Sequence, residues 1–430
     1  MSLRIVGAPF CYGVLLVWSL SAFAAAGATE ISEPTGVLQR QQALDLAMTH
    51  NPGLMASQAE IQALQGIAEQ ASTLPNPEIE VLRENFGNDR LQGTDGPTTT
   101  LAMGQLLELG GKRGARRDSA NALHVGAEQD YLLARAMLRA EVNQAYTELL
   151  AAQARQQLAR DMIALAEETH RTVAETVKAG KVSPLEETRA GIILASARLD
   201  TEQAERDLMT ARSRLSATWA SAHPLFTEAE TDWDPLPELP PIDALAARLP
   251  ESPEMTRWAS TVTQREAEQG LARAQRIPDL TVRAGIKRYE ELNEDVYLVG
   301  ASIPLPLFNR NQGSVREANA RLEQARHEQG STAGRLGQQL NDSYSRLQGA
   351  RARAIGLKQV VIPAAEQVLQ ATREGYRHGK FRLFDVLDAQ RTVYTTRGQY
   401  LTALTEFHQR LADLERLLGA PLVTANGDRK

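Results

Sequence analysis

Few residues of this 430-residue chain have the spacing that a chemical site requires. Its seven histidines are scattered along the sequence, and the single cysteine, Cys11, lies near the N-terminus. Neither residue type forms the clusters that bind zinc or other transition metals. A glycine-rich phosphate loop and a nucleophile elbow are also missing. These patterns predict no metal site, no cofactor and no enzymatic activity.

Asp385 and Asp388 are the most suggestively spaced carboxylates. Residues three apart in a helix lie on one face, and both aspartates follow Gly379-Lys380, a pair typical of a helix end. In the first turn of a new helix they would be favoured simply by the helix dipole. On the residues alone, that structural role is the preferred interpretation, and Gly180 and Gly379 are explained as C-cap glycines.

The composition favours a long, alanine-rich helical protein. Hydrophobic residues make up 43% of the chain but aromatic residues only 5%, so few rings are available for a globular core. The chain has 47 Lys and Arg against 53 Asp and Glu, a net charge of -6 with both signs interspersed. This balance predicts no nucleic-acid partner.

The N-terminus has the features of a secretory signal peptide. Arg4 precedes an apolar run from about Gly13 to Phe23, and small residues follow it. We expect a signal over residues 1–26, with an N-terminal membrane anchor as the alternative. Cys11 falls inside this segment and follows Phe10, so we expect no lipidation there. Later in the chain no apolar run is long enough for a transmembrane helix.

The chain is predicted to contain an internal duplication. Asn51-Pro52 corresponds to Ser252-Pro253, and Gly180-Lys181 corresponds to Gly379-Lys380, each at an offset of about 200 residues. The predicted organisation is a first repeat over 27–222, a linker or equatorial segment over 223–252, a second repeat over 253–420 and a tail over 421–430.

Each repeat is expected to carry two strands and a long helical hairpin. Alternating apolar and polar residues predict strands at about 77–87 and 97–107, and again at about 278–289 and 295–306. Residues 112–178 contain no proline and would span about 100 Å as a helix. Residues 311–362 are likewise predicted to form a long helix, and a kink or break is expected at Pro363. Helices from Pro184 and Leu383 are predicted to run back antiparallel.

Four strands cannot close a barrel, and lipid does not tolerate an open sheet edge. Soluble hairpins with one dry face would show the same alternation. With export and duplication added, a membrane barrel is favoured. Eight strands fill their interior with side chains, whereas twelve from three copies leave an aqueous lumen. The predicted fold class is α+β, a trimeric 12-stranded transmembrane barrel continued by a long helical barrel.

Two motif regions resemble the TolC-like outer-membrane efflux factors. One is the repeated helical turn at 179–190 and 376–389. The other combines Leu-Pro-Asn-Pro-Glu at 74–78 with Glu-Leu-Gly-Gly-Lys-Arg at 108–113, and is most similar to the cobalt-zinc-cadmium resistance branch. The resemblance implies a homotrimer in the outer membrane of a Gram-negative bacterium that extends into the periplasm. It also implies a periplasmic adaptor and a resistance-nodulation-division pump as partners, and outer-membrane lipid around the barrel.

The resemblance assigns roles to residues at the two turns. It implies a channel constriction at Asp385, Asp388, Glu186 and Tyr376, where a ring of carboxylates would attract cations. It implies adaptor docking at Gly180, Lys181, Gly379 and Lys380. The sequence departs from the family at Phe381, where an arginine often stands, so the bonds that hold the closed state are not carried over.

Three functions are consistent with these patterns. The first is a passive exit duct for divalent heavy-metal cations such as cobalt, zinc and cadmium. The second is the same channel serving drugs, solvents or a secreted polypeptide. The third is a soluble periplasmic coiled-coil adaptor, which the alternating strands and the duplication disfavour.

Overall fold

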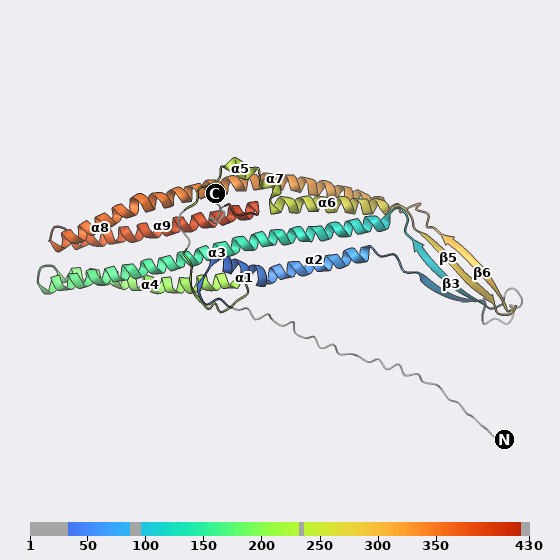
Figure 1. The fold of residues 1–430 in the computed structure, drawn as a ribbon, viewed down its shortest axis with the longest axis horizontal. Helices are drawn as coiled ribbons and strands as arrows, with labels where there is room; N and C mark the ends of the chain where they lie inside the picture. The colour runs from blue at the N-terminus through green and yellow to red at the C-terminus, as the bar shows by residue number, and fades with distance from the viewer. Residues whose placement is uncertain (1–32, 87–95, 232–235, 423–430) are drawn as a thin grey trace, which may run out of the picture. The chain divides into compact units, whose positions relative to one another are not determined.

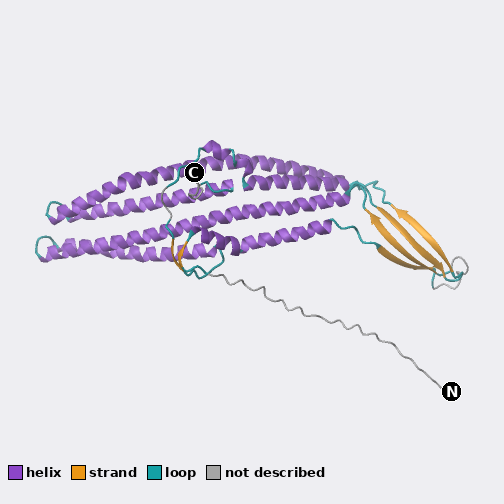
Figure 2. Ribbon diagram, in the orientation of Figure 1, coloured by secondary structure: helices purple, strands orange, loops and turns teal. Residues whose placement is uncertain are grey.

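The computed structural model describes residues 33–86, 96–231 and 236–422. The predicted signal peptide, Cys11, part of the first strand-connecting loop and nearly all of the tail lie outside these residues. Helices dominate the described chain, and two small sheets accompany them (Figures 1 and 2). The principal elements are α1 (Arg40–His50), α2 (Pro52–Ala71), β2 (Glu78–Glu84), β3 (Thr98–Leu107), α3 (Lys112–Lys178), α4 (Pro184–Ala217), α6 (Pro253–Ala274), β5 (Leu280–Tyr289), β6 (Glu294–Ser302), α7 (Gln312–Gly356), α8 (Ile362–Arg377) and α9 (Leu383–Leu418).

The 67-residue helix α3 has both predicted ends. It begins after Gly111, whose left-handed backbone (φ 71°) turns the chain out of β3. It ends before Gly180, which is also left-handed (φ 70°). Helix α4 then runs back along α3, as predicted (Figure 1). The absence of proline and the many good helix formers account for this length.

The corresponding helix of the second half is interrupted. A π-helical turn, Leu357–Val361, separates α7 from α8, and Pro363 stands in the first turn of α8. Because proline lacks an N–H, it is accommodated where the regular hydrogen-bond ladder is already broken. The break predicted at Pro363 is therefore confirmed, and it begins six residues earlier, at Leu357. Helix α9 returns along α7 and α8.

The four predicted strands form one antiparallel sheet in the order β2-β3-β5-β6. β2 pairs with β3, β3 with β5 and β5 with β6, so β2 and β6 are the edge strands. Strand β6 ends at Ser302, whereas alternation predicted residue 306. Pro304 and Pro306 explain the difference, because neither can donate to a ladder.

One face of this sheet is apolar and exposed. Two rows of cross-strand neighbours lie on this face. One consists of Ile79, Met103, Ala284 and Val299, and the other of Val81, Leu101, Ile286 and Tyr297. Val299 and Tyr297 are 88% and 87% exposed. A row of exposed apolar side chains on a protein surface marks a contact with lipid or another chain.

The opposite face carries ion pairs that reach across β3. Arg283 on β5 binds Glu80 on β2 at 3.0 Å, and Lys287 binds Glu84 at 3.1 Å. The β3 residues between them are small: Thr98, Thr100, Ala102 and Gly104. This absence of bulk lets the long basic side chains span the strand. The sheet is therefore apolar on one side and charged on the other.

A second sheet was not predicted from the sequence. β1 (Gly36–Leu38) pairs in parallel with β4 (Phe226–Ala229), which lies in the predicted linker. The Tyr146 hydroxyl of α3 donates to the carbonyl oxygens of Leu38 and Glu230, both at 3.0 Å. The short helix α5 (Ile242–Ala246) places Leu245 in a core shared with α7 and α9. These contacts hold the predicted linker segment against α3, α7 and α9.

Helix packing supplies most of the core. Alanine and leucine dominate the buried positions of α3, including Leu138, Ala145, Leu149 and Leu150. Small residues at helical spacing allow long helices to approach closely along one stripe. In the described part of the chain, no helix is both long and apolar enough to cross a membrane.

Candidate functional site

Both helical turns end in the same hydrogen-bonded cap. After α3, Gly180 N–H donates to the Val177 carbonyl at 2.9 Å and Lys181 N–H to that of Thr176 at 3.1 Å. After α8, Gly379 N–H donates to Tyr376 at 2.9 Å and Lys380 N–H to Gly375 at 2.7 Å. This is the Schellman arrangement, with glycine in the left-handed position. The C-cap role predicted for both glycines is confirmed.

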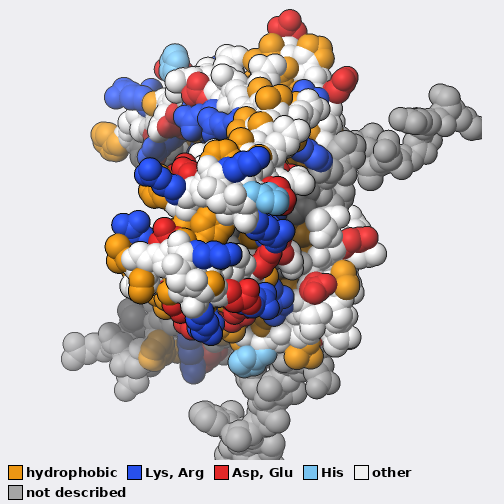
Figure 3. Space-filling model, turned by 90° about the vertical axis from the view of Figure 1, so that its left-hand side faces the viewer, with side chains coloured by type: hydrophobic (Ala, Val, Ile, Leu, Met, Phe, Trp, Pro, Cys, Tyr) orange, Lys and Arg blue, Asp and Glu red, His pale blue; other side chains and the backbone are white. Residues whose placement is uncertain are grey.

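The two turns present basic side chains without acidic ones. Residues 178–183 and 377–382 contain five Lys or Arg and one His, and no Asp or Glu. Lys181 and Lys380 are exposed. Figure 3 looks at the end of the molecule where both turns lie, and basic side chains are prominent on it. Cations here complement the C-terminal ends of α3 and α8.

Asp385 acts as a helix cap. Its carboxylate accepts a hydrogen bond from the backbone N–H of Arg382, the residue that precedes α9, at 2.8 Å. This hydrogen bond gives a partner to one of the backbone N–H groups that have none within the helix at its start. Asp388 lies one turn later and is exposed. Among the described residues its carboxylate has no hydrogen-bond or ion-pair partner, so it is free to face a solvent-filled space.

Glu186 and Tyr376 are brought together by the fold. Glu186 stands in the first turn of α4 and Tyr376 in the last turn of α8. Burial raises the pKa of Tyr376, and the negative charge of Glu186 raises it further. The Tyr376 hydroxyl and one Glu186 oxygen are buried and without a hydrogen-bond partner in the described chain. The predicted constriction residues thus divide into a neighbouring pair, a helix cap and an exposed carboxylate.

Sequence reasoning missed the polar contacts that join the two hairpins near these turns. Glu168 of α3 binds Arg373 of α8 at 2.5 Å and Arg377 at 3.3 Å. The buried Gln390 amide of α9 donates to the Thr169 hydroxyl at 2.6 Å. Val173, Ala190 and Leu383 form the apolar core beside them. The partners are about 200 residues apart in the chain, so no local motif marks them.

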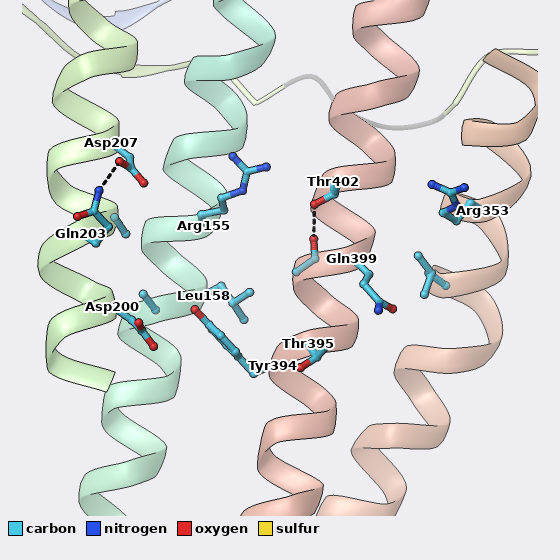
Figure 4. Close-up of a pocket in the computed structure, with 14 residues that line it drawn as sticks. Arg155, Leu158, Asp200, Gln203, Asp207, Arg353, Tyr394, Thr395, Gln399 and Thr402 are labelled. Atoms are coloured by element: carbon cyan, nitrogen blue, oxygen red, sulfur yellow. Dashed lines mark hydrogen bonds between the residues drawn. The ribbon is translucent and has the colours of Figure 1, made fainter. Parts of the chain in front are cut away.

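A recess of about 860 Å³ lies between the two hairpins, further from the turns. Figure 4 shows α4 and α3 on one side of it and α9 and α7 on the other. Its charged lining residues are Arg155, Asp200, Asp207 and Arg353. Tyr394 of α9 points toward Asp200 of α4, and burial together with that carboxylate raises the pKa of Tyr394.

The recess and the sheet of β1 and β4 lie on different sides of α3. Gln153 of α3 faces that sheet, because its side chain bonds to Ala229 of β4 at 2.8 Å. Arg155 lines the recess two residues later, about 200° around the helix. On α9, Thr395, Gln399 and Thr402 line it and share a helical face with Asp388. Asp388 and the recess therefore lie on the same side of the helical layer.

Metal-ligand clusters are absent from the described residues. No group of three or more His, Cys, Asp or Glu side chains there is arranged to hold a metal ion. The described site consists of two capped turns, the neighbouring residues Tyr376 and Glu186, and the polar recess further along the hairpins. The exposed carboxylate in this arrangement can attract cations.

Comparison with known proteins assigns the family. The model of the outer membrane efflux protein family matches twice, over residues 43–221 and 245–420. The chain is 36% identical over 387 residues to the cobalt-zinc-cadmium resistance protein CzcC of Cupriavidus metallidurans, covering 90% of this chain and 91% of that protein. It is 29% identical over 317 residues to the nickel-cobalt-cadmium resistance protein NccC of Alcaligenes xylosoxydans xylosoxydans, covering 73% and 70%.

Solved structures show the same fold. The crystal structure of CusC matches with a TM-score of 0.75 and 18% identity, covering 90% of this chain and 94% of that one. The outer membrane protein VceC of Vibrio cholerae matches with a TM-score of 0.72 and 20% identity, covering 89% and 97%. The two matches to the family model together span most of this chain. The chain therefore belongs to the outer membrane efflux protein family.

Proposed function

We propose that this chain is the outer-membrane exit duct of a tripartite resistance-nodulation-division efflux system for divalent heavy-metal cations of the cobalt, zinc and cadmium type. The observation that carries the proposal is the 36% identity, over 90% of the chain, to a cobalt-zinc-cadmium resistance protein. A second relative is named for nickel, cobalt and cadmium resistance. The family is one of outer-membrane efflux channels, which conduct and do not catalyse.

The duct is a homotrimer. The four-stranded sheet has two unpaired edges, β2 and β6, and an exposed apolar face suited to lipid. Three copies give twelve strands and a lumen wide enough for hydrated ions. The chain is duplicated, with copies at 27–222 and 253–420, and the double match of the family model supports this.

The turns at Gly180-Lys181 and Gly379-Lys380 receive a periplasmic adaptor, and the pump lies beyond it. Support comes from their matching capped geometry and exposed lysines. Asp385, Asp388, Glu186 and Tyr376 form the constriction. Tyr376 of the second hairpin lies near enough to Glu186 of the first for that charge to raise its pKa, which supports a closed state that involves both hairpins. The free Asp388 carboxylates would ring the axis and attract cations.

Metal selection is assigned to the pump and the adaptor, because the described residues offer no metal-ligand cluster. The alternative cargo is a drug, solvent or polypeptide. The third interpretation, a soluble periplasmic adaptor, loses its support, since the family that matches is an outer-membrane one.

Deletion of the gene tests the proposed cargo. We expect tolerance to cobalt, zinc and cadmium to fall and to be restored by the intact gene, while tolerance to drugs and solvents stays unchanged. Copper tolerance is measured alongside as a metal outside the named set. Unchanged metal tolerance together with lost drug tolerance would contradict the metal assignment and favour the alternative cargo.

A further inference from the structure

The segment that follows α9 is tied back to that helix by one carboxylate. Helix α9 ends at Leu418, and Gly419 follows it in the left-handed conformation (φ 73°). The chain then turns back, so that the Leu422 N–H donates to the Glu415 carboxylate at 3.0 Å. The Leu422 side chain packs against the core that α7 and α9 share. Glu415 is thus a polar anchor for the segment 419–422.

Glu415 lies close to basic groups from three helices. Arg40 of α1 and Arg139 of α3 act on it through their charges, and Arg416 of α9 lines the same small cavity. Burial raises the pKa of Glu415. The Leu422 N–H and the two arginine charges lower the pKa, but burial outweighs them. Glu415 therefore takes up a proton at a higher pH than an ordinary glutamate does.

The small cavity also contains a buried acceptor without a donor. It has a volume of about 10 Å³ and lies between α3 and α9, where Asn143 and Arg139 face Glu415. Asn143 is only 9% exposed, and its Oδ1 has no hydrogen-bond partner in the described chain. An amide oxygen and an ionised carboxylate are both acceptors, so they cannot bond to each other. A protonated carboxyl has an O–H and can donate to the amide oxygen.

We propose that Glu415 is a pH-dependent latch for the segment 419–422. In its ionised form the carboxylate holds the Leu422 N–H. When it takes up a proton from solvent, it donates that proton in a hydrogen bond to Asn143 Oδ1 and releases Leu422. The geometry provides for both states, because Glu415 has a backbone donor on one side and lines a cavity with an unpartnered acceptor on the other.

Thermodynamic linkage fixes the direction of the switch. The Leu422 N–H lowers the pKa of Glu415, so it binds the ionised form more tightly than the protonated form. The Leu422 contact is therefore present above the pKa of Glu415 and is weakened as pH falls through it. The sign for the whole fold is opposite. Because the folded-state pKa is raised, the stability associated with Glu415 is present below the ordinary pKa and is lost as pH rises through the folded value.

A nitroxide label at residue 420 of the full-length protein reports the state of the latch. The label is attached to Ala420→Cys in a Cys11→Ser background, and its mobility is followed by electron paramagnetic resonance from neutral to acidic pH. We expect an immobilised label at neutral pH and a mobile one in acid. The midpoint should lie above the ordinary pKa of a glutamate, because Glu415 is buried.

Two substitutions separate the partners of the carboxyl group. Glu415→Gln removes the titrating group, and we expect the mobility of the label to become independent of pH. Asn143→Leu removes the acceptor of the protonated form. It should weaken proton binding about fivefold, the effect of losing one hydrogen bond, and so move the midpoint to lower pH.

Asp413→Asn is the matched control. Asp413 stands two residues before Glu415 in α9, but it pairs with Gln144 at 2.8 Å and Arg410 at 3.2 Å and is absent from the lining of the cavity. This substitution removes the same charge from the same helix and should leave the midpoint unchanged. An unaltered helical circular dichroism signal shows that each variant is folded.

Three results would overturn the latch. One is a label whose mobility does not change with pH in the protein that carries no further substitution. Another is a pH response that survives Glu415→Gln, because the response would then belong to a different group. The third is an unchanged midpoint in Asn143→Leu, which would show that the protonated carboxyl does not use the buried acceptor. None of these results bears on the proposed duct.

Discussion

At the scale of single residues, the two aspartates predicted for the constriction have different structural roles. Asp385 holds the start of α9 through the Arg382 N–H, whereas Asp388 makes no such bond in the described chain. The structural interpretation that the residues alone favoured therefore holds for Asp385. The Asp388 carboxylate takes part in no helix cap in the described chain, so it can take the role that is proposed for it in the channel lumen.

Substitution separates the two roles. We expect Asp388→Ala and Asp385→Asn to reduce the cation preference of the passive ion conductance, because each removes negative charge from the proposed constriction. Asp385→Ala should do the same and also destabilise the start of α9 by about 1 kcal/mol. Conductance in planar bilayers and amide hydrogen exchange at residues 382–388 measure the two effects. Unaltered cation preference in all three variants would remove these aspartates from the constriction.

Tyr376 and Tyr394 should respond to alkaline pH. Both hydroxyls have a pKa above the ordinary value of about 10, because of burial and a nearby carboxylate. A raised folded-state pKa means that the folded protein holds the proton more tightly than the unfolded chain. The associated stability is present below the ordinary pKa and is lost as pH rises through the folded value.

Tyrosinate absorbance measures this directly. Tyr376→Phe and Tyr394→Phe should each remove one component that ionises above the ordinary range. Glu186→Gln should move the Tyr376 component toward lower pH, since the repelling charge is gone. If a component that ionises above the ordinary range remains after both Phe substitutions, the raised pKa does not belong to these two hydroxyls.

At the scale of elements, local patterns predicted the long helices and strands well. Helix α3 has its predicted bounds because proline is absent from it and left-handed glycines follow both β3 and α3. The strands appear where side chains alternate, and β6 stops early because of its prolines. Strands β1 and β4 were missed, since three and four residues are too short for a periodic signal.

The contacts between hairpins could not be predicted from one sequence. Glu168 meets Arg373 and Arg377 only because two separate hairpins pack side by side. Charge runs on a helix surface give no indication of which distant helix they will face. The proximity of Tyr376 and Glu186 likewise depends on that packing, although the family resemblance pointed to both residues.

The Glu168 contacts should hold the hairpins together near the turns. We expect Glu168→Ala to leave Arg373 without an ion pair, whereas Arg377 keeps Glu374 at 4.0 Å. The substitution should weaken this contact by about 1 kcal/mol or less because the side chains are partly exposed, and it should raise passive conductance. Double-mutant cycles with Arg373→Ala measure the coupling.

The adjacent Glu167 offers a matched control. It pairs with Arg198 of α4 at 3.4 Å, within the first hairpin. Glu167→Ala removes the same charge from the same helix but breaks no contact between hairpins. Equal conductance changes from the two substitutions would indicate a general charge effect and contradict a specific hold by Glu168.

At the scale of the whole molecule, family, fold and location agree. The chain is an outer membrane efflux protein with the fold of known outer-membrane channels. Its sheet has an apolar face and a charged face, and its helices carry a polar recess on the side that also bears Asp388. A duct with a lipid-facing wall and a hydrated interior accounts for both features. In the proposed trimer, such a duct is formed by three copies of the chain around one axis.

The most direct test of this account is the native mass of the protein extracted from isolated outer membranes in a mild detergent. We predict recovery from the outer-membrane fraction at three times the mass of the mature protomer, because only closure among copies satisfies the β2 and β6 edges. A soluble monomer, released from the periplasm without detergent, would contradict the channel.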